Sequence, residues 1–406
     1  MKIKFHHVLA FFLVTLFFDL DYESPLIRLR IIDGFLVVLV VLMILSVGRF
    51  KTNNNAAAMS FYIFMIYILV NGVLKIGFST TIKEFFQLIE YVFIMHLIAK
   101  ATDESKKREE FMNVLFWGTG CVAIFSVIYN VSRGNYTDYK DLDAPKHSFA
   151  VFALFAVANL ITSKKKTLFQ LITVFFALII LLLSGERKGW VGFIAGGGVF
   201  TYLQLKASLS KKNIQAIVTF MVIVVIVGII TELYFVSQPE LRYLDRQLSS
   251  FSDVSNIFSD DNSQFASRSD EDRIFMFNLG LELFANNPIS GVGIDQFRRY
   301  VEEATHGWSH DAHNFYLKVL AEEGIIGIVL FFIPLFLIFI DLWKKSKNKT
   351  PHIATAAHIL MGLFLLGGLV NFFLAAKALS WFYIILPCGM LLGLNKELTF
   401  YKNSNK

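Results

Sequence analysis

The chain has few charged residues for its length. Only 17% of its 406 residues are Asp, Glu, Lys or Arg, whereas 55% are hydrophobic and 43 are Phe. With a mean hydropathy of +0.57, this composition is too apolar for a soluble domain of this size. We therefore expect an integral membrane protein.

Cysteine is also nearly absent, which excludes a fold held together by disulfides. The two cysteines, Cys121 and Cys388, both fall inside apolar runs. A disulfide there would not brace an exposed loop, so we expect both to be packing residues.

Two further absences narrow the function. The sequence has no repeat with a period of about 20 to 50 residues and no matched pair of Gly- or Pro-broken helices, which argues against an inverted-repeat transporter. The net charge of +6 comes without a basic patch interleaved with aromatic residues outside the loops. Nucleic acid is therefore not an expected partner.

What the sequence does contain is a series of apolar runs expected to cross about 30 Å of hydrocarbon as helices. They cover residues 7–19, 31–48, 57–75, 82–99, 111–131, 148–163, 167–183, 189–205, 214–235, 324–341, 353–376 and 380–394. The first run is short and rich in Phe, but no small-residue cleavage site follows it, so we interpret it as a helix rather than a signal peptide. The expected fold is an all-α integral membrane protein with about 12 transmembrane helices.

Basic residues gather in alternate loops, for example at 106–108, 164–166 and 344–349. Short loops rich in Lys and Arg stay on the cytoplasmic side of a membrane. Both termini are therefore expected in the cytoplasm. The long interval 237–323 is expected on the periplasmic side of a bacterial inner membrane.

This topology divides the chain into three parts. Residues 1–236 hold nine transmembrane helices, residues 237–323 form a large periplasmic loop, and residues 324–406 hold three more helices and a cytoplasmic tail. Within the loop, apolar spacing predicts a first, interfacial helix in 240–251 and a second short helix beginning at Arg273. The sequence PISGVG, which follows the second helix, is typical of a turn.

Ionisable residues at a membrane face are costly and often functional. Arg187 and Lys188 fall in a tight loop between two apolar runs on the expected periplasmic side. A guanidinium there can hold a phosphate with two hydrogen bonds, which suits a lipid-linked diphosphate. The structural alternative is a salt bridge to Glu186 or snorkelling of the side chain to the interface.

Arg273 stands at the head of the second loop helix, after the acidic run SDED. It offers a second contact for a diphosphate, or alternatively a helix-end salt bridge with Asp270 or Glu271. Arg298 and Arg299 offer the same chemistry, and nothing local ranks them.

Three histidines precede the return of the chain to the membrane. His306, His310 and His313 are spaced so that a helix would present them on one face. No Glu or Cys completes a familiar ligand pattern, so we expect no metal here. Besides a purely structural histidine, the sequence allows a general base, because imidazole titrates near neutral pH and can take a proton from a sugar hydroxyl.

The segment that begins with the last histidine resembles the signature of the O-antigen ligase family. In that signature a His followed by Asn, Ser or Gln is followed, after nine intervening residues, by Gly and then, after two more, by Gly, Thr or Tyr. The matching residues here are His313, Asn314, Gly324 and Gly327.

The resemblance extends to two arginines. The family carries an outer-loop Arg followed after three residues by Leu, and Arg187 matches that Arg although Val191 stands in the place of the Leu. The stretch DRIFMFNLGLELFANNPISGVGIDQF is similar to the family segment before the histidine, with Arg273 at the second arginine.

The resemblance implies an integral-membrane glycosyltransferase of the GT-C type that needs no metal or other cofactor. It would move a glycan from undecaprenyl diphosphate to the lipid A core oligosaccharide, with inversion at the anomeric carbon. The implied catalytic residues are His313, Arg187 and Arg273, and the implied substrate-binding residues are Arg187, Lys188, Arg273, His310 and Asn314.

Two alternatives remain open at this point. An O-antigen or exopolysaccharide polymerase of the same superfamily would use the same donor and residues but extend a second lipid-linked repeat unit. A transporter of an anionic lipid or glycan would use the arginines to guide its cargo.

Overall fold

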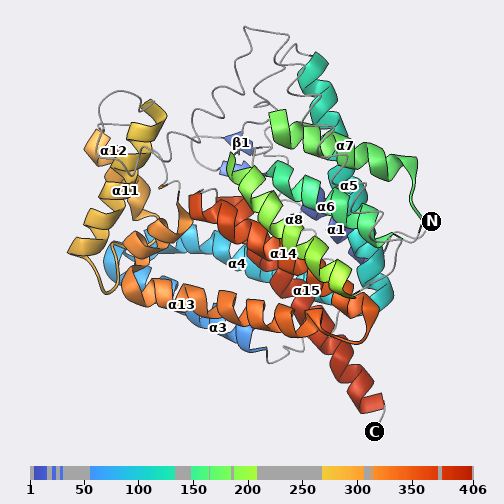
Figure 1. Cartoon of the computed structure of the whole chain (residues 1–406). Coiled ribbons are helices and arrows are strands. Elements are labelled where there is room, and N and C mark those ends of the chain that lie inside the picture. The colour runs from blue at the N-terminus through green and yellow to red at the C-terminus, as the bar shows by residue number, and fades with distance from the viewer. Residues whose placement is uncertain are drawn as a thin grey trace.

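The computed structural model of the chain describes residues 4–15, 21–23, 28–30, 55–132, 148–163, 165–183, 187–207, 268–305, 312, 314–373 and 377–404. Helices account for most of these residues (Figure 1). They are α1 (Phe5–Thr15), α3 (Ala56–Ile76), α4 (Phe78–Ala101), α5 (Ser105–Ser132), α6 (Ser148–Thr162), α7 (Leu168–Leu183), α8 (Arg187–Ala207), α11 (Arg268–Asn286), α12 (Gln296–Thr305), α13 (Phe315–Ser346), α14 (Pro351–Phe373) and α15 (Lys377–Ser404).

A two-stranded antiparallel hairpin is the one departure from an all-helical fold within the described residues. It consists of β1 (Asp21–Glu23) and β2 (Arg28–Arg30). The register pairs Asp21 with Arg30 and Glu23 with Arg28, so acidic positions stand opposite basic ones. Opposite charges across a strand pair favour such a hairpin, which a search for long apolar runs does not detect.

Ten of the twelve apolar runs coincide with helices of the described residues. The runs 31–48 and 214–235, and the interfacial helix expected at 240–251, lie outside the residues that the structure describes. The helix expected from Arg273 is confirmed as part of α11.

The composition and exposure of the helices fit a multi-pass membrane protein. The described helices that are long and apolar enough to cross a membrane are Ala56–Ile76, Ser105–Ser132, Phe315–Ser346 and Pro351–Leu369 of α14, and several shorter apolar helices accompany them. Large apolar side chains face outward, among them Leu74 at 80% and Phe336 at 64% exposure. A surface in contact with water rarely carries so many large exposed apolar side chains, whereas a lipid-facing surface does.

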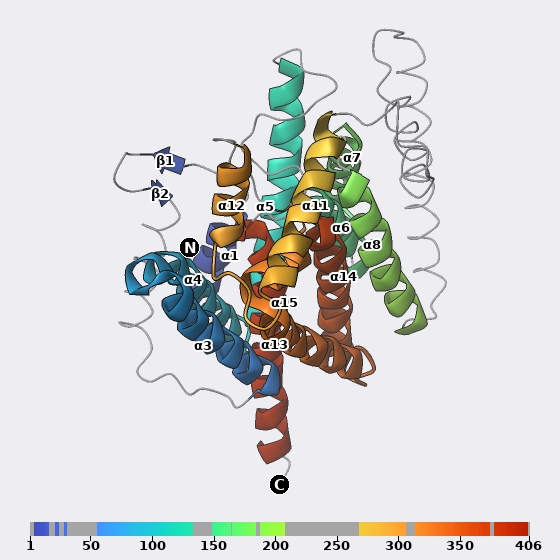
Figure 2. The same cartoon turned by 90° about the vertical axis from the view of Figure 1, so that its left-hand side faces the viewer.

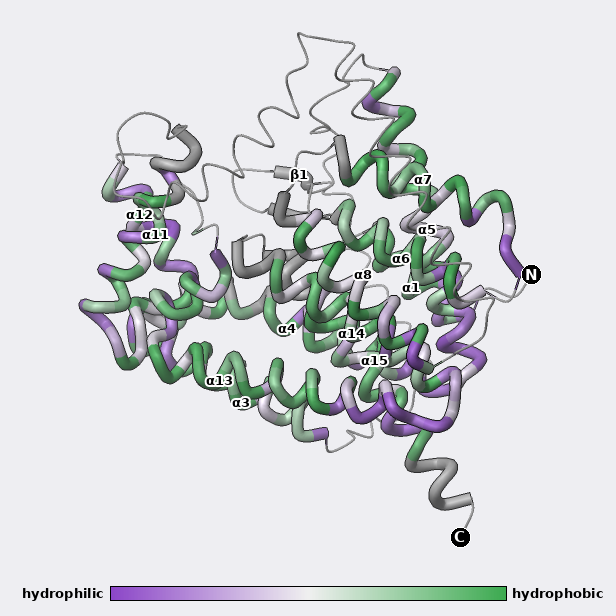
Figure 3. The backbone as a smooth tube through the Cα atoms, viewed as in Figure 1, coloured by the Kyte–Doolittle hydropathy of each residue, from purple (hydrophilic) through white to green (hydrophobic). Residues whose placement is uncertain are grey.

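Hydrophilic segments gather at two opposite ends of the helices, with hydrophobic stretches between them (Figure 3). At 1.5 Å per residue the 32 residues of α13 extend over roughly 45 to 50 Å, which connects the two ends. Its start lies beside α11 and α12 (Figure 2). We call the end formed by α11, α12 and the start of α13 the loop end.

The opposite end, which we call the basic end, joins the starts of α1 and α5 to the last part of α15. Lys4 Nζ lies 2.7 Å from Glu110 Oε2, and Lys396 Nζ lies 2.8 Å from Asp103 Oδ2. Segments predicted from their Lys and Arg content to share one side of the membrane therefore meet in space.

Candidate active site at the loop end

Asn314 fixes the start of α13. It has an extended backbone (φ −143°, ψ 109°), and its side-chain oxygen accepts a hydrogen bond from the Leu317 amide at 3.0 Å. This is the preferred chemistry of a helix N-cap. The residue after His313 therefore has a structural role, in addition to any contact with substrate.

α13 does not begin where the apolar run begins. The run predicted a transmembrane helix from 324, but α13 starts at Phe315, and Gly324 interrupts it with non-helical dihedrals (φ 65°, ψ −164°). A positive φ is accessible to glycine at little steric cost. α13 thus has a short part before Gly324, on the loop-end side, and a long apolar part after it.

The turn between α11 and α12 inserts into this interruption. Val292 and Gly293 donate their amides to the carbonyls of Ala321 (3.1 Å) and Glu322 (2.7 Å). In return, Ile325 donates to Pro288 at 2.9 Å, and the neighbouring amide of residue 326 donates to Ile289 at 3.2 Å. Backbone groups left unpaired by the broken helix are satisfied by the turn, and those of the turn by the helix.

Glycine is required on both sides of this contact. A Cβ on Gly291 would lie 2.3 Å from the carbonyl carbon and oxygen of Glu322, and one on Gly324 would lie 2.5 Å from those of Ile289. Both residues also have a φ of 65°. The glycine of the family signature at 324 and the PISGVG turn, recognised separately in the sequence, are thus two halves of one contact.

A small hydrophobic core binds α11 and α12 to the start of α13. It contains Met276, Leu283, Val292, Phe297, Val301, Ala312 and Ala321. Position 273 belongs to the first turns of α11, three residues before Met276 of this core. Gly280 lies against Leu317 of α13, and Ala312 directly precedes His313 in the chain. The helix α11 and Ala312, the described residue next to position 313, therefore belong to one packed unit.

Buried charges fix the same unit. Lys318 is 5% exposed, and its Nζ lies 3.3 Å from Asp295 Oδ1 and 3.8 Å from Glu322 Oε1. Glu322 Oε1 also accepts a hydrogen bond from the Phe297 amide at 3.0 Å, which caps the start of α12. A carboxylate at a helix N-terminus is favoured by the unpaired amides and by the helix dipole.

A second buried acid ties the unit to α3. Asn71 donates from its side-chain amide to Glu323 Oε2 at 2.8 Å and to the Ser290 carbonyl at 2.7 Å. Tyr67 donates its hydroxyl to the Glu323 carbonyl at 2.7 Å. α3 therefore holds both the turn and the α13 segment that meets it.

The start of α8 reaches the same end of the molecule. A Cβ on Gly196 of α8 would lie 2.3 Å from the Gly362 carbonyl oxygen of α14, and Gln204 donates to Thr355 Oγ1 at 3.3 Å. At these two contacts the residue numbers of α14 fall as those of α8 rise, so the two helices are antiparallel. Close contacts between glycines are common between membrane helices. Both helices rise by the same distance per residue, so Arg187 lies level with about residue 371 of α14.

The end of α14 in turn contacts the start of α13. Tyr316 donates its hydroxyl to the Gly368 carbonyl at 2.9 Å. Tyr316 is three residues beyond His313, and Gly368 is close to the level of Arg187. The backbone segments that carry Arg187, Arg273 and His313 thus all lie at the loop end.

The structure describes these candidate residues to different extents. The side chains of Arg187, Lys188 and Arg273 and the whole of His306, His310 and His313 lie outside the described residues. On α12, Arg298 is exposed, and Arg299 pairs with Glu303 at 2.9 Å on the same exposed helix surface.

Sequence reasoning did not single out Lys318, Glu322, Glu323 and Asn71. The adjacent acids of AEEG, directly before the apolar run, were an available signal, because buried carboxylates at a membrane face need partners. Their partners could not be read from the sequence, since Asn71 and Glu323 are 252 positions apart.

These features define a multi-pass helical membrane protein whose loop end is organised around a broken helix. Residues 172–332 match the family model described as O-antigen ligase. The matched part runs from within α7 to within α13 and contains the interruption at Gly324 and the turn that fills it. Residues 172–332 thus carry the O-antigen ligase family domain, and the resemblance seen in the sequence is confirmed.

The chain is also similar to a protein of Haemophilus influenzae described as uncharacterized. The two are 24% identical over 248 residues, which cover 58% of this chain and 58% of that protein. The match therefore spans less than two thirds of the relative's length and adds no information on activity.

Proposed function

We propose that the protein is an O-antigen ligase that transfers a glycan from undecaprenyl diphosphate to the lipid A core oligosaccharide. The observation that carries the proposal is the meeting, at the loop end, of the backbone segments that bear Arg187, Arg273 and His313. These segments are far apart in the sequence, and a shared site gives a reason for their convergence. The family domain covers all three.

The loop end is proposed to face the periplasm of a Gram-negative bacterium, with the protein in the inner membrane and both termini in the cytoplasm. In this arrangement the chain has about twelve membrane helices of the GT-C type, and residues 237–323 form the periplasmic loop. The collection of Lys4, Lys107 and Lys396 at the opposite end supports this orientation, because basic segments stay on the cytoplasmic side.

A lipid-linked donor fits the surface of α11. Ile274 (49%), Phe277 (48%) and Leu281 (42%) are exposed on a helix at the loop end, and Ile289 in the following turn is 65% exposed. Exposed apolar side chains at a membrane face favour contact with lipid chains. A donor anchored in the bilayer would keep its diphosphate and reacting sugar at this level.

In the proposed reaction, an acceptor hydroxyl of the core oligosaccharide attacks the anomeric carbon of the donor glycan. The bond from that carbon to the diphosphate oxygen breaks, and undecaprenyl diphosphate leaves with the bonding electron pair. His313 takes the proton of the attacking hydroxyl, and Arg187 and Arg273 stabilise the negative charge that develops on the leaving diphosphate. Direct displacement inverts the anomeric configuration and requires no metal ion.

The remaining predicted residues are proposed to bind substrate around this reaction. Lys188 lies next to Arg187 on the first turn of α8, and His310 precedes the base by three residues. Asn314 caps α13 through its Oδ1 atom, so its proposed contribution to binding is tied to keeping the start of that helix, and hence His313, in place.

A polymerase of the same superfamily is the second candidate, and the shared family domain is what favours it. It would use the same donor and the same residues, with a second lipid-linked repeat unit as acceptor. A transporter of an anionic lipid or glycan would need no acceptor at all.

One reconstitution separates these functions. The purified full chain is placed in vesicles with glycan-linked undecaprenyl diphosphate and lipid A core, without an ion gradient. Label on the lipid A core supports the ligase, and lengthened polymer on undecaprenyl diphosphate supports the polymerase instead. Movement of the donor across the bilayer without transfer would overturn the enzyme proposal.

A further inference from the structure

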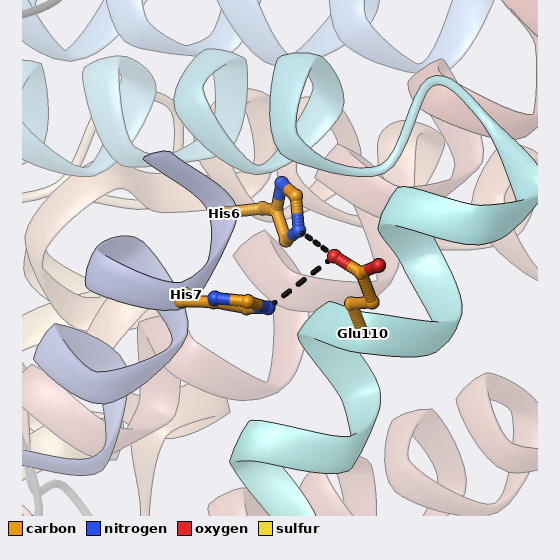
Figure 4. A group of neighbouring side chains, drawn as sticks. All are labelled: His6, His7 and Glu110. Carbon is orange, nitrogen blue, oxygen red and sulfur yellow. Dashed lines mark hydrogen bonds and ion pairs between the residues drawn. The ribbon is translucent and has the colours of Figure 1, made fainter. Parts of the chain in front are cut away.

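At the basic end, two consecutive histidines of α1 converge on one carboxylate of α5 (Figure 4). His6 Nε2 lies 2.6 Å from Glu110 Oε2, and His7 Nε2 lies 3.3 Å from the same oxygen. The two imidazole rings stand edge to face, with centroids 4.5 Å apart. Glu110 is more than 100 positions from both histidines in the sequence, so the packing of α1 against α5 creates the group.

The three side chains form a set suited to a divalent transition metal. Their nearest ligand atoms all lie within 4.8 Å of one another. A tetrahedral Zn²⁺ at about 2.0 to 2.2 Å from two imidazole nitrogens and one carboxylate oxygen holds these atoms roughly 3.4 Å from one another. The distance from His7 Nε2 to Glu110 Oε2, 3.3 Å, already matches this value, and the 2.6 Å between His6 Nε2 and the same oxygen would have to lengthen by under about 1 Å. Imidazole and carboxylate ligands suit zinc better than the oxygen-only sites of Mg²⁺ or Ca²⁺.

One of the three side chains is buried, and the other two are partly accessible to solvent. The His6 side chain is 7% exposed, whereas those of His7 and Glu110 are 25% and 24% exposed. The buried ligand is positioned by packing, and the more open pair leaves access for the ion and for a water molecule as fourth ligand.

Lys4 occupies part of the position that an ion would need. Its Nζ lies 2.7 Å from Glu110 Oε2 and 2.9 Å from Oε1. An ammonium and a metal ion compete for the same carboxylate charge, because both are cations at close range. Bound metal would take Oε2 and leave Lys4 with Oε1.

We propose that His6, His7 and Glu110 form a Zn²⁺ site that clamps the start of α1 to α5 at the basic end. The site lies away from the loop end, so its metal takes no part in the proposed transfer reaction. Its effect is on the stability of the α1–α5 contact, because an ion that binds only the folded protein stabilises it by mass action.

The test measures zinc binding to the full chain in detergent or nanodiscs, metal-stripped and purified on a tag without histidine. Calorimetric titration of the wild type with Zn²⁺ is expected to give one equivalent per chain and a rise in the unfolding temperature. His6→Ala, His7→Ala and Glu110→Gln are each expected to weaken binding by at least about tenfold. His7 is partly exposed, so its alanine variant is expected to stay folded.

Two control variants separate a zinc site from a simple charge cluster. His352→Ala removes another histidine of the basic end, which pairs with Glu397 at 3.3 Å, and is expected to leave zinc binding unchanged. Lys4→Gln is expected to keep or tighten zinc binding because it removes the competing cation. Absence of stoichiometric binding in the wild type, or binding that survives in His7→Ala, would overturn the proposal.

Discussion

A methyl group on Gly324 would lie 2.5 Å from the carbonyl carbon and oxygen of Ile289. The clash cannot be relieved by a side-chain rotation, because the nearby atoms belong to the backbone of the turn that fills the broken helix. The same turn is bonded on both sides to α13. The first prediction follows from this contact.

Gly324→Ala and Gly291→Ala are each expected to lower the free energy of unfolding by at least about 2 kcal/mol, since each combines a positive φ with a backbone clash. Thermal unfolding in detergent measures the effect. The control is Gly198→Ala in α8, where a Cβ meets nothing within 4 Å, and this variant should be as stable as the wild type. Wild-type stability of both loop-end variants would contradict the described contact.

The second prediction concerns Arg187. Arg187→Ala should abolish transfer while the protein still inserts, and Arg187→Lys should retain little activity, because an ammonium cannot reproduce a bidentate contact with a diphosphate. The reconstituted transfer assay measures both. Arg299→Lys changes an exposed arginine paired with Glu303 and should leave the rate unchanged. Full activity of Arg187→Lys would instead favour simple charge or snorkelling.

The third prediction separates base catalysis from donor binding. His313→Ala should lower turnover by roughly 10²- to 10⁴-fold with donor affinity nearly unchanged, because the arginines are proposed to supply that affinity. The wild-type rate should fall as the pH drops below the pKa of the base. His310→Ala should be milder. An inactive His310 variant beside an active His313 variant would mean that the roles are reversed, and normal activity of both would exclude a histidine base.

A fourth prediction uses a chelator to separate the two proposed sites. Transfer at a temperature where the protein stays folded should survive EDTA, because the reaction assigned to the loop end uses no metal. The unfolding temperature should fall on chelation if the zinc site at the basic end is filled. Loss of transfer that one divalent ion restores would contradict a metal-independent mechanism.

The fifth prediction concerns Asp103, in the turn between α4 and α5. Burial opposes its ionisation, but hydrogen bonds from Lys396 (2.8 Å) and Lys107 (3.1 Å) outweigh burial and hold the pKa of that carboxyl below its ordinary value. A carboxyl with a depressed folded-state pKa contributes stability that is present above its unfolded pKa of about 4 and is lost as the pH falls through the folded pKa.

Asp103→Asn should therefore cost about 1 kcal/mol at neutral pH, a modest value because both lysines are partly exposed to solvent. The gap between wild type and variant should stay constant down to about pH 5 and then close on further acidification. Unfolding temperatures across this pH range measure it. If the difference in unfolding temperature instead widens as the pH falls, Asp103 is not stabilised in its ionised form and the prediction is wrong.

The long helices could be predicted from the sequence because a long apolar run is by itself the signal of a helix that contacts lipid or the protein core. The start of α13 at Asn314 and the turn after α11 were also predictable, since an N-cap residue and a Pro-Gly pattern act locally. α12 was not anticipated: only Gln296, Phe297 and Val301 of this mainly polar helix are buried, so no apolar run marks it.

The supporting contacts of the candidate site depend on residues that are distant in sequence. The pairing of Lys318 with Asp295, and of Asn71 with Glu323, is set by how α3, α11 and α13 pack. Neither pair leaves a local pattern. The sequence could thus nominate Arg187, Arg273 and His313, but not the framework that brings their segments to one end.

The bonds from Tyr67 and Asn71 to the α13 segment have a consequence for chimaeras between this chain and related ones. A segment exchanged at boundaries 268 and 323 would be inserted without the α3 side chains that hold its turn. The Ser290 carbonyl and the Glu323 carboxylate would then face whatever the recipient carries at positions 67 and 71. Exchange of this segment should therefore give a stable protein only when these two α3 positions are exchanged with it.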